Sequence, residues 1–407
     1  MSTTIGSAPL RLAPEQPATA NRWFGVGRSL SRDARTAGVE ATAAALNGRH
    51  AALLVVFCPI TVDALAMLEG VRAEAGDVPL IGCTGLAVLD PTGAGQAVVV
   101  SALGGDGFEV RTSVATNLSA GQRAAGELVA ESVHGLTREH KMLVLFCDGL
   151  AGEQHDMVRG AYSVVGATIP LVGGCAADDF TYQQTFQFYG DSEGVHVYTD
   201  AVVGAAIGSD GAMGVGIAHG WHKVGEPMVA TSSTTGGTIR TLDGEPAFEM
   251  YRRRVGMTPE VAADPQAFAL VAIGHPIGMS RRSGEDIRVI HSGNAAEGTI
   301  SCLADVPQGA LVWMMESDHS SLIHGANDAY DDMLKALDGA PPLGFLTFDC
   351  GSRHLVLEEE GIRQEIEGIA SRAAGVPFAG FYTYGEIART RGARGMHNLT
   401  VVMAAFA

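Results

Sequence analysis

The chain has 407 residues, 46% of them hydrophobic, and its 45 acidic and 27 basic side chains give a net charge of −18. This length allows two or three domains with sizeable cores. No Lys/Arg cluster offers a face for phosphates, so nucleic acid is not an expected partner. The apolar runs are too short to cross a bilayer, and the N-terminus lacks the apolar core of a secretory signal.

Six cysteines stand at positions 58, 83, 147, 175, 302 and 350. No two of them have the CxxC spacing of a zinc site or a redox dithiol. In a chain of this length, this pattern favours buried, reduced thiols in a cytoplasmic protein.

In chain order, residues 1–20 are rich in Ser, Thr, Ala and Pro and predict a disordered tail. From Trp23 the pattern predicts strand, helix, strand, helix and then two more strands. The same order recurs from EVRTSVAT (109–116) and again from GALVWMMES (309–317). We therefore expect three copies of a β-α-β-α-β-β unit.

Two short motifs mark each copy. An apolar strand ends in Phe and Cys: ALLVVFC (52–58), MLVLFC (142–147) and GFLTFDC (344–350). A second strand carries Val or Ile, then Pro, two apolar residues and Gly: VPLIGCTG (78–85), IPLVGGCAADD (169–179) and VPFAGFYTYGE (376–386). If the repeat is real, Cys58, Cys147 and Cys350 lie at equivalent strand ends.

Residues 211–310 interrupt this order. The stretch 214–233 predicts a β-hairpin, 245–255 a short helix, and AFALVAIGHPIG (267–278) a buried strand that ends in Gly-His-Pro. Strands that alternate with helices predict an α/β fold, and the hairpins make its helix-covered sheets mixed.

Six segments, taken together and in order, resemble the FIST family: LIGCTG, LVGGCAADDF, AHGWHKVG, LDGEPAFEMY, FDCGSR and AGFYTYGEI. The resemblance covers the chain from about residue 22. It implies a FIST N domain at 21–225, with two repeat units, and a FIST C domain at 226–407, with the hairpin-rich insertion and the third unit.

The resemblance also implies a function. FIST domains are sensory ligand-binding domains of bacterial signalling proteins. A chain of this size without a fused output domain is similar to the NosP type, which binds haem, senses nitric oxide and regulates a separate histidine kinase or cyclic-di-GMP enzyme. We expect a cytoplasmic sensor of this kind. The alternatives are a sensor of an amino acid or other small metabolite without haem, and a purely structural interaction module; self-association stays open.

In such sheets, ligands collect at the carboxyl ends of strands. The polar residues found there are candidate ligand-binding residues: Cys83, Thr84, Asp178, Asp179, Arg353, Tyr382, Tyr384 and Glu386. Arg353 is expected to clamp a carboxylate or a haem propionate, and a structural ion pair with Glu386 is the alternative. We expect Arg353, Tyr384 and Glu386 to share one cavity.

A haem iron needs an axial ligand, for which His is the common choice. His275 is the first candidate because it ends a predicted strand, followed by His319 after WMMES and His354 after Arg353. The absence of CxxCH excludes covalent haem attachment. Thiolate ligation by Cys83, Cys175 or Cys350 is the other option.

Catalysis is not expected. The chain has no GxSxG, no P-loop, no HExxH and no GxGxxG after a strand. A hydrolase that uses a Cys or Glu side chain is the dissenting alternative.

Overall fold

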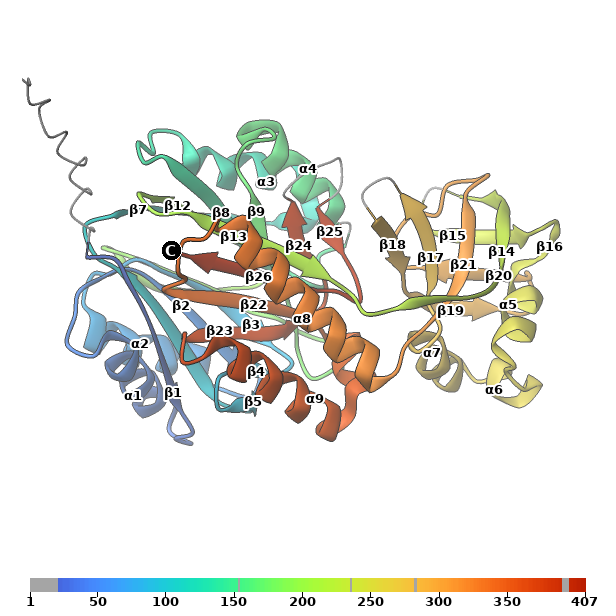
Figure 1. Ribbon diagram of the computed structural model, residues 1–407, viewed down its shortest axis with the longest axis horizontal. Coiled ribbons are helices and arrows are strands. Elements are labelled where there is room, and N and C mark those ends of the chain that lie inside the picture. The colour runs from blue at the N-terminus through green and yellow to red at the C-terminus, as the bar shows by residue number, and fades with distance from the viewer. Residues whose placement is uncertain (1–20, 153, 235, 282–283, 390–394) are drawn as a thin grey trace, which may run out of the picture.

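The computed structural model describes residues 21–152, 154–234, 236–281, 284–389 and 395–407, so the predicted tail of residues 1–20 lies outside the described part. The described chain forms a large α/β body and a smaller β-rich insert, residues 222–316, beside it (Figure 1). The predicted fold class, mixed sheets covered by helices, is confirmed. No helix among the described residues is long and apolar enough to span a membrane.

The first sheet of the body has the strand order β1-β6-β2-β3-β10-β11. These strands are β1 (Trp23–Ser29), β2 (Ala51–Pro59), β3 (Leu80–Gly85), β6 (Val98–Gly104), β10 (Gln187–Asp191) and β11 (Gly194–Tyr198). Its helices are α1 (Ala34–Leu46) and α2 (Ala64–Ala75). Each starts at an aspartate, Asp33 or Asp63, whose carboxylate accepts a backbone N–H of the first turn.

The second sheet has the order β25-β24-β9-β8-β12-β7. Its strands are β7 (Phe108–Thr116), β8 (His140–Asp148), β9 (Leu171–Ala176), β12 (Ala201–Ser209), β24 (Glu386–Arg389) and β25 (Met396–His397). The helices of this unit are α3 (Gln122–Ala130) and α4 (Gln154–Val165), with short 3-10 turns at Leu118–Ala120 and Glu131–Val133.

The third sheet has the order β13-β26-β22-β23-β4-β5. Its strands are β4 (Val88–Asp90), β5 (Gly93–Gly95), β13 (Met213–Ala218), β22 (Gly344–Cys350), β23 (Phe378–Thr383) and β26 (Val401–Phe406). Helices α8 (His319–Ala336) and α9 (Gly351–Ala373) cover it.

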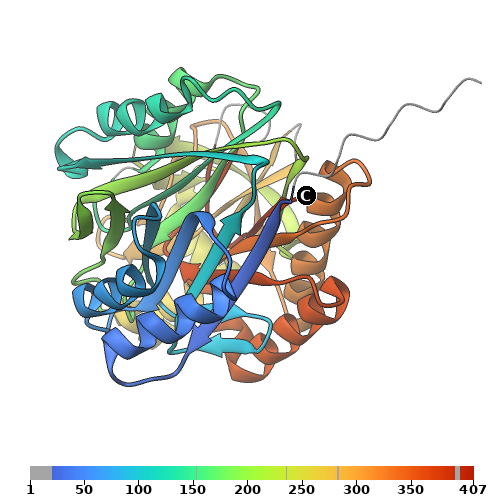
Figure 2. The same cartoon turned by 90° about the vertical axis from the view of Figure 1, so that its left-hand side faces the viewer.

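All three sheets follow one plan. Four strands of a unit lie as β1-β6-β2-β3, β7-β12-β8-β9 or β13-β26-β22-β23. Each sheet then receives a hairpin from another unit: β10–β11 joins β3, β24–β25 joins β9 and β4–β5 joins β23. Each unit therefore gives one hairpin to the sheet of another unit and receives one in return from the third. The helix pairs lie on three sides of the strands (Figure 2).

Four phenylalanine rings meet where the three sheets face one another. Phe57, Phe146 and Phe348 are the residues of the repeated Phe-Cys motif, and Phe381 of β23 lies among them. The ring centroid of Phe381 is 4.9, 5.8 and 5.9 Å from those of Phe57, Phe146 and Phe348. All four side chains are fully buried. The repeated Phe therefore forms the centre of the core.

The repeated glycine has a steric reason. Gly82, Gly173 and Gly380 each pair with the residue that precedes the repeated Phe on the parallel neighbour strand. A Cβ at any of the three would collide with the carbonyl oxygen of that residue, so glycine lets the backbones approach. This equivalent placement is compatible with the predicted repeat.

The cysteine part of the repeat prediction is wrong for the third unit. Cys58 and Cys147 directly follow their Phe, whereas Asp349 stands between Phe348 and Cys350. Because side chains alternate along a strand, Asp349 takes the helix-facing place of the two cysteines. Cys350 faces the other way.

The first strand of the third unit was also predicted wrongly. It is β13, not residues 309–317, and the predicted hairpin 214–233 is divided between two sheets. Gly214 and Gly216 of β13 lie so close to the α8 backbone that a Cβ on either would collide with it. Gly25 and Gly27 of β1 meet α1 in the same way. The glycines of β13 thus allow α8 to pack closely on this strand, which completes the third sheet by pairing with β26.

The described residues of the insert form an eight-stranded sheet and three helices. Its elements are β14 (His222–Ser233), β15 (Thr238–Leu242), β16 (Glu245–Pro246), α5 (Ala247–Val255), α6 (Pro259–Ala263), α7 (Pro265–Ile273), β17 (Ile277–Arg281), β18 (Gly284–Arg288), β19 (Ile290–Asn294), β20 (Thr299–Cys302) and β21 (Leu311–Glu316). The strand predicted over 267–278 is wrong, because most of it is α7. Asp264 caps this helix and Pro265 occupies its first turn.

Candidate functional site: a pocket between the body and the insert

The carboxyl ends of the three parallel strand pairs meet in one region of the body. Backbone hydrogen bonds join the three strand-end segments to one another: Ala177 N–H to Thr84 O at 3.0 Å, Leu86 N–H to Tyr382 O at 3.1 Å and Cys175 N–H to Gly385 O at 2.8 Å. Such strand ends are where ligands bind in α/β sheets.

A cavity of about 450 Å³ lies between these strand ends and the insert. We call it the junction pocket. The body contributes Gly149, Phe180, Tyr182, Cys350, Ser352, Thr383, Tyr384 and Asn398. The insert contributes Ala269, Ile273, Val289, Ile290, His291 and Leu303. Its volume and its largely apolar lining are typical of small-molecule sites.

One wall of the junction pocket is aromatic. Tyr182 stacks on Tyr384 with ring centroids 5.0 Å apart, and Phe180 lies 6.0 Å from Tyr384. Phe180 and Tyr182 have φ values of 66° and 54°, in the left-handed region that bulky residues rarely adopt. Backbone strain of this kind gathers at ligand sites, and Tyr182 is 60% exposed. The stacked tyrosines offer a flat face to a ring.

Asp178 holds this strained loop in place. Its carboxylate accepts hydrogen bonds from the Tyr384 hydroxyl, from Thr181 Oγ1 and from backbone N–H groups of residues 182–184. Burial opposes ionisation of this carboxyl, but the donors, led by Tyr384, bring its pKa below the usual value. The Asp178 charge therefore stabilises the aromatic wall and is not free for a ligand.

The polar part of the lining is uncharged. It consists of Ser352, Thr383, Asn398 and His291, and no Lys or Arg is among the described residues that line the pocket. Burial lowers the pKa of His291, which favours the neutral imidazole. The junction pocket thus combines stacking faces with neutral hydrogen-bonding groups.

Arg353 does not line this pocket. Its side chain is fully buried; Nε donates to Asp349 Oδ1 at 2.6 Å, and Nη2 forms an ion pair with Glu365. The other two acceptors are backbone carbonyls, described below. The predicted alternative, an ion pair between Arg353 and Glu386, is not found either.

Glu386 is also buried outside the pocket. Its carboxyl accepts from Thr383 Oγ1 at 2.6 Å and from Oγ1 and N of Thr400 at 2.8 and 3.2 Å. The predicted cavity shared by Arg353, Tyr384 and Glu386 is therefore wrong, since Tyr384 alone of the three lines it. Burial raises the pKa of Glu386 to about 8, although hydrogen bonds from the two threonines lower it in part.

This raised pKa makes stability depend on pH. Between the ordinary value of 4.5 and about 8, the folded protein holds a proton on Glu386 that the unfolded chain has lost. The stabilisation is complete below the unfolded pKa and is lost as pH rises through the folded one. We expect the free energy of unfolding to fall by about 1.4 kcal/mol for each unit of pH increase in this window. Glu386→Gln, which retains an amide oxygen for Thr400, should remove this slope.

The measurement is urea unfolding of both proteins between pH 5 and 9. Glu367→Gln is the control, because Glu367 is an exposed carboxylate of α9. Equal pH slopes for wild type and Glu386→Gln would contradict the prediction.

The remaining predicted ligand-binding residues are structural or exposed. Cys83 is fully buried in the core, and Thr84 Oγ1 accepts from Phe186 N–H at 3.1 Å. Asp179 is exposed and accepts from Thr181 Oγ1. Tyr382 is fully buried with its ring 4.7 Å from that of His354. Of the predicted ligand-binding residues, Tyr384 thus lines the pocket, and Asp178 supports it through a hydrogen bond from the Tyr384 hydroxyl.

None of the three predicted axial histidines lines the junction pocket. His275 follows α7 rather than a strand, and its Nδ1 bonds Val271 O at 2.9 Å. His319 is the first residue of α8, and the His354 ring contacts the Tyr382 ring edge to face. Of the predicted thiolate ligands, only Cys350 reaches the pocket. Burial raises its pKa, which opposes the thiolate.

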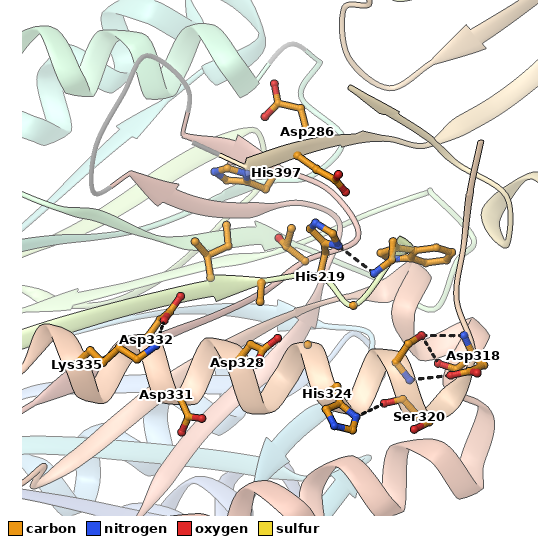
Figure 3. A pocket seen from close by; sticks show the side chains of 18 residues that line it. His219, Asp286, Asp318, Ser320, His324, Asp328, Asp331, Asp332, Lys335 and His397 are labelled. Atoms are coloured by element: carbon orange, nitrogen blue, oxygen red, sulfur yellow. Dashed lines mark hydrogen bonds and ion pairs between the residues drawn. The ribbon is translucent and has the colours of Figure 1, made fainter. Parts of the chain in front are cut away.

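A second cavity, an open groove of about 890 Å³ that we call the acidic groove, runs along α8 (Figure 3). Its lining is rich in carboxylates, several of which already have partners within the chain. Asp332 pairs with Lys335 at 2.8 Å, Asp331 with Arg372, and Glu285 with Lys223 at 2.6 Å. The groove lacks the apolar lining of the junction pocket, which is therefore the better candidate.

The comparisons with known proteins agree with this architecture. The FIST N domain matches residues 52–245 and the FIST C domain matches residues 247–389. The chain belongs to the FIST family. FIST domains are associated with signal-transduction sensors that bind small ligands and are not known as catalytic domains. The predicted boundary between residues 225 and 226 stays a prediction.

Similar proteins occur in bacteria and archaea. This FIST protein is 26% identical over 404 residues to an uncharacterized protein of Mycobacterium tuberculosis strain H37Rv, and equally so to its counterpart in strain CDC 1551. These alignments cover 94% of this chain and 99% of each relative. An uncharacterized protein of Methanocaldococcus jannaschii is 25% identical over 230 residues, 54% of this chain and 41% of that protein.

Sequence reasoning missed most of the pocket, since Tyr384 and Cys350 are the only described lining residues that were candidates. Phe180 directly follows Asp179, Tyr182 comes two residues later, and two aromatic residues in a polar loop after a strand end were a usable signal. His291 and the apolar residues of the insert had no such signal, because only the folded arrangement brings them to the strand ends.

Proposed function

We propose that this FIST protein is a cytoplasmic sensor whose junction pocket binds a small, uncharged and partly aromatic metabolite. The observation that carries the proposal is the stacked Tyr182–Tyr384 pair on one wall of a 450 Å³ cavity at the strand ends. Its polar groups suit neutral donors and acceptors on the ligand.

The charge distribution argues against an anionic ligand. A carboxylate needs a cationic or multiple N–H partner when it is desolvated. Arg353 lies outside the pocket in ion pairs with Asp349 and Glu365. The described lining of the pocket contains no Lys or Arg. The predicted carboxylate clamp by Arg353 was the reason to expect an amino-acid ligand, and the pocket does not contain it.

Because the family acts in signal transduction, we further propose that occupancy is passed to a separate protein, either a histidine kinase or a cyclic-di-GMP enzyme. The exposed junction between body and insert is the natural place for such a partner to sense occupancy.

Indole is a suitable neutral aromatic probe for the pocket. We expect Tyr182→Ala to weaken indole binding about twofold to twelvefold, since a stacked ring contributes about 0.5–1.5 kcal/mol. The fold should be unaffected because Tyr182 is 60% exposed. Isothermal titration calorimetry measures the affinity. Tyr198→Ala is the control, because Tyr198 stacks on His196 outside the pocket. Absence of indole binding, or unchanged affinity in Tyr182→Ala, would count against the proposal.

Haem with nitric oxide detection is the second candidate, and one observation favours it. His291 brings a ring whose pKa is lowered by burial to an apolar pocket, and a neutral imidazole is what a haem iron binds. The fit is otherwise poor, because the described lining offers no cation to the propionates. A Soret band after addition of haemin that is lost in His291→Ala would favour haem over the neutral metabolite.

A further inference from the structure

The insert is joined to the body by two short connections that lie side by side. One comprises residues 218–222, between β13 and β14, and the other residues 316–319, between β21 and α8. At the insert side, β14 and β21 pair with each other, and His222 is opposite Glu316. Two adjacent strands that cross between two units form a natural hinge.

The first connection is anchored along its body side. Trp221 is buried and its indole N–H donates to Leu399 O at 3.2 Å. Gly220, with φ of 81°, lies so close to the first turn of α8 that a Cβ would collide with Ser321 O. Gly220 and Trp221 are therefore held against the start of α8 and against the body.

The second connection is fixed by the start of α8. The Asp318 carboxylate accepts from Ser321 N–H at 2.7 Å, and Ser321 Oγ accepts from Asp318 N–H at 3.0 Å. This capping box holds the helix end rigid. His219, on the first connection, and Asp318, on the second, both line the acidic groove (Figure 3).

Arg353 binds the first connection and the start of α8, the helix that follows the second connection. Its Nη1 donates to His219 O at 2.8 Å, in the first connection, and its Nη2 to Leu322 O at 3.3 Å, in the first turn of α8. Asp349 at the end of β22 and Glu365 of α9 hold the same guanidinium in position. A planar fork with fixed donor directions is required for four partners of this kind.

Arg353 also follows directly on residues that line the junction pocket. Cys350 and Ser352 belong to that lining, and Arg353 is the next residue of α9. The turn that carries them is separated from the rest of α9 by Glu358, whose φ of 52° breaks the helix. Glu365 lies beyond this break, so its ion pair with Arg353 spans it.

We propose that Arg353 is the clamp that sets the orientation of the insert relative to the body and thereby the width of the junction pocket. A ligand that displaces the turn with Cys350 and Ser352 would move Arg353 and, with it, the first connection and the start of α8. This last step rests on the proposed ligand-binding function. The clamp itself requires no ligand and is tested without one.

The test is a distance measurement between two spin labels by pulsed electron paramagnetic resonance. Label sites are Leu128→Cys in α3, where Leu128 is 52% exposed, and Glu297→Cys in the exposed turn between β19 and β20. The six native cysteines are buried, so the introduced thiols react selectively. Arg353→Lys keeps the charge but cannot reach both carbonyls and both carboxyls.

We expect a single narrow distance distribution in the parent protein and a second, shifted population in Arg353→Lys. Arg363→Lys is the matched control. Arg363 lies on the same helix in exposed ion pairs with Glu360 and Glu367, and its replacement should leave the distribution unchanged. An unchanged distribution in folded Arg353→Lys overturns the proposal.

A second variant keeps the test decisive if Arg353→Lys does not fold. Glu365→Leu removes one partner that positions the guanidinium but leaves the ion pair with Asp349. It should also produce the second population, and an unchanged distribution in this variant overturns the proposal as well. Because indole binding plays no part in these measurements, failure of the clamp and failure of the proposed ligand give different results.

Discussion

Arg353→Met is expected to lower the free energy of unfolding by about 3–5 kcal/mol, because it leaves buried acidic groups without their cation. The side chains of Asp349 and Glu365 are 3% and 1% exposed, so water cannot replace the guanidinium. Burial already raises the pKa of Glu365. Loss of Arg353 also leaves the carbonyl of His219 without its side-chain donor. Urea unfolding followed by circular dichroism measures the effect.

Arg363→Met provides the comparison on the same helix. Its ion pairs with Glu360 and Glu367 are exposed, and such pairs contribute at most about 1 kcal/mol. If the two variants lose similar stability, the buried network is not the stabilising feature described above.

Phe381→Ala is expected to cost about 3–5 kcal/mol, the range for removing a buried aromatic ring. The ring contacts Phe57, Phe146 and Phe348 of all three units. The neighbouring rings of Phe57, Phe146 and Phe348 are themselves fully buried and close-packed, so they cannot move far enough to fill the space left by Phe381. The cavity should therefore persist. Thermal and urea unfolding measure the loss.

Phe381→Leu separates packing from aromatic contact. Because it retains much of the volume, we expect a loss of about 1.5 kcal/mol or less. A loss under 1 kcal/mol for Phe381→Ala would show that the four-ring cluster is not the centre of the core.

The acidic groove along α8 has a different role in the architecture from the junction pocket. Residues of both connections line the groove, whereas none of them is among the described residues that line the junction pocket. The groove is open and its carboxylates bind nearby Lys and Arg side chains, whereas the pocket is lined by uncharged groups. The insert therefore contributes to both cavities, with carboxylates in the groove and mainly apolar side chains in the pocket.

Much of the body follows from local sequence. Apolar runs between helix signals predict buried strands, and the repeated Pro-Gly and Phe-Cys motifs mark the parallel pairs at similar spacing. Gly82, Gly173 and Gly380 have a steric reason that applies to one strand pair at a time, which is why a repeated motif was sufficient to find them. Asp178 and Tyr384 followed from the rule that ligands bind at strand ends.

Pairing between distant segments was decided by the tertiary structure alone. Residues 214–218 and 309–317 are both apolar and strand-like, and only the close contact of Gly214 and Gly216 with α8 selects the first for the third sheet. An apolar run such as 267–273 suits a strand or a helix equally by composition. Here the Asp264–Pro265 cap and the packing of the insert make it a helix.

The sequence by itself determined the family, the α/β class and the strand ends at which a ligand site should lie, because these depend on local periodicity and on motifs in order. The tertiary structure decided which side chains face the junction pocket. Asp349 shifts Cys350 by one residue and so turns it to the opposite face of its strand. Arg353 lies inside, where two acidic side chains and two backbone carbonyls surround it. Whether a polar side chain faces a ligand or the interior depends on neighbours far away in the chain, which no local pattern encodes.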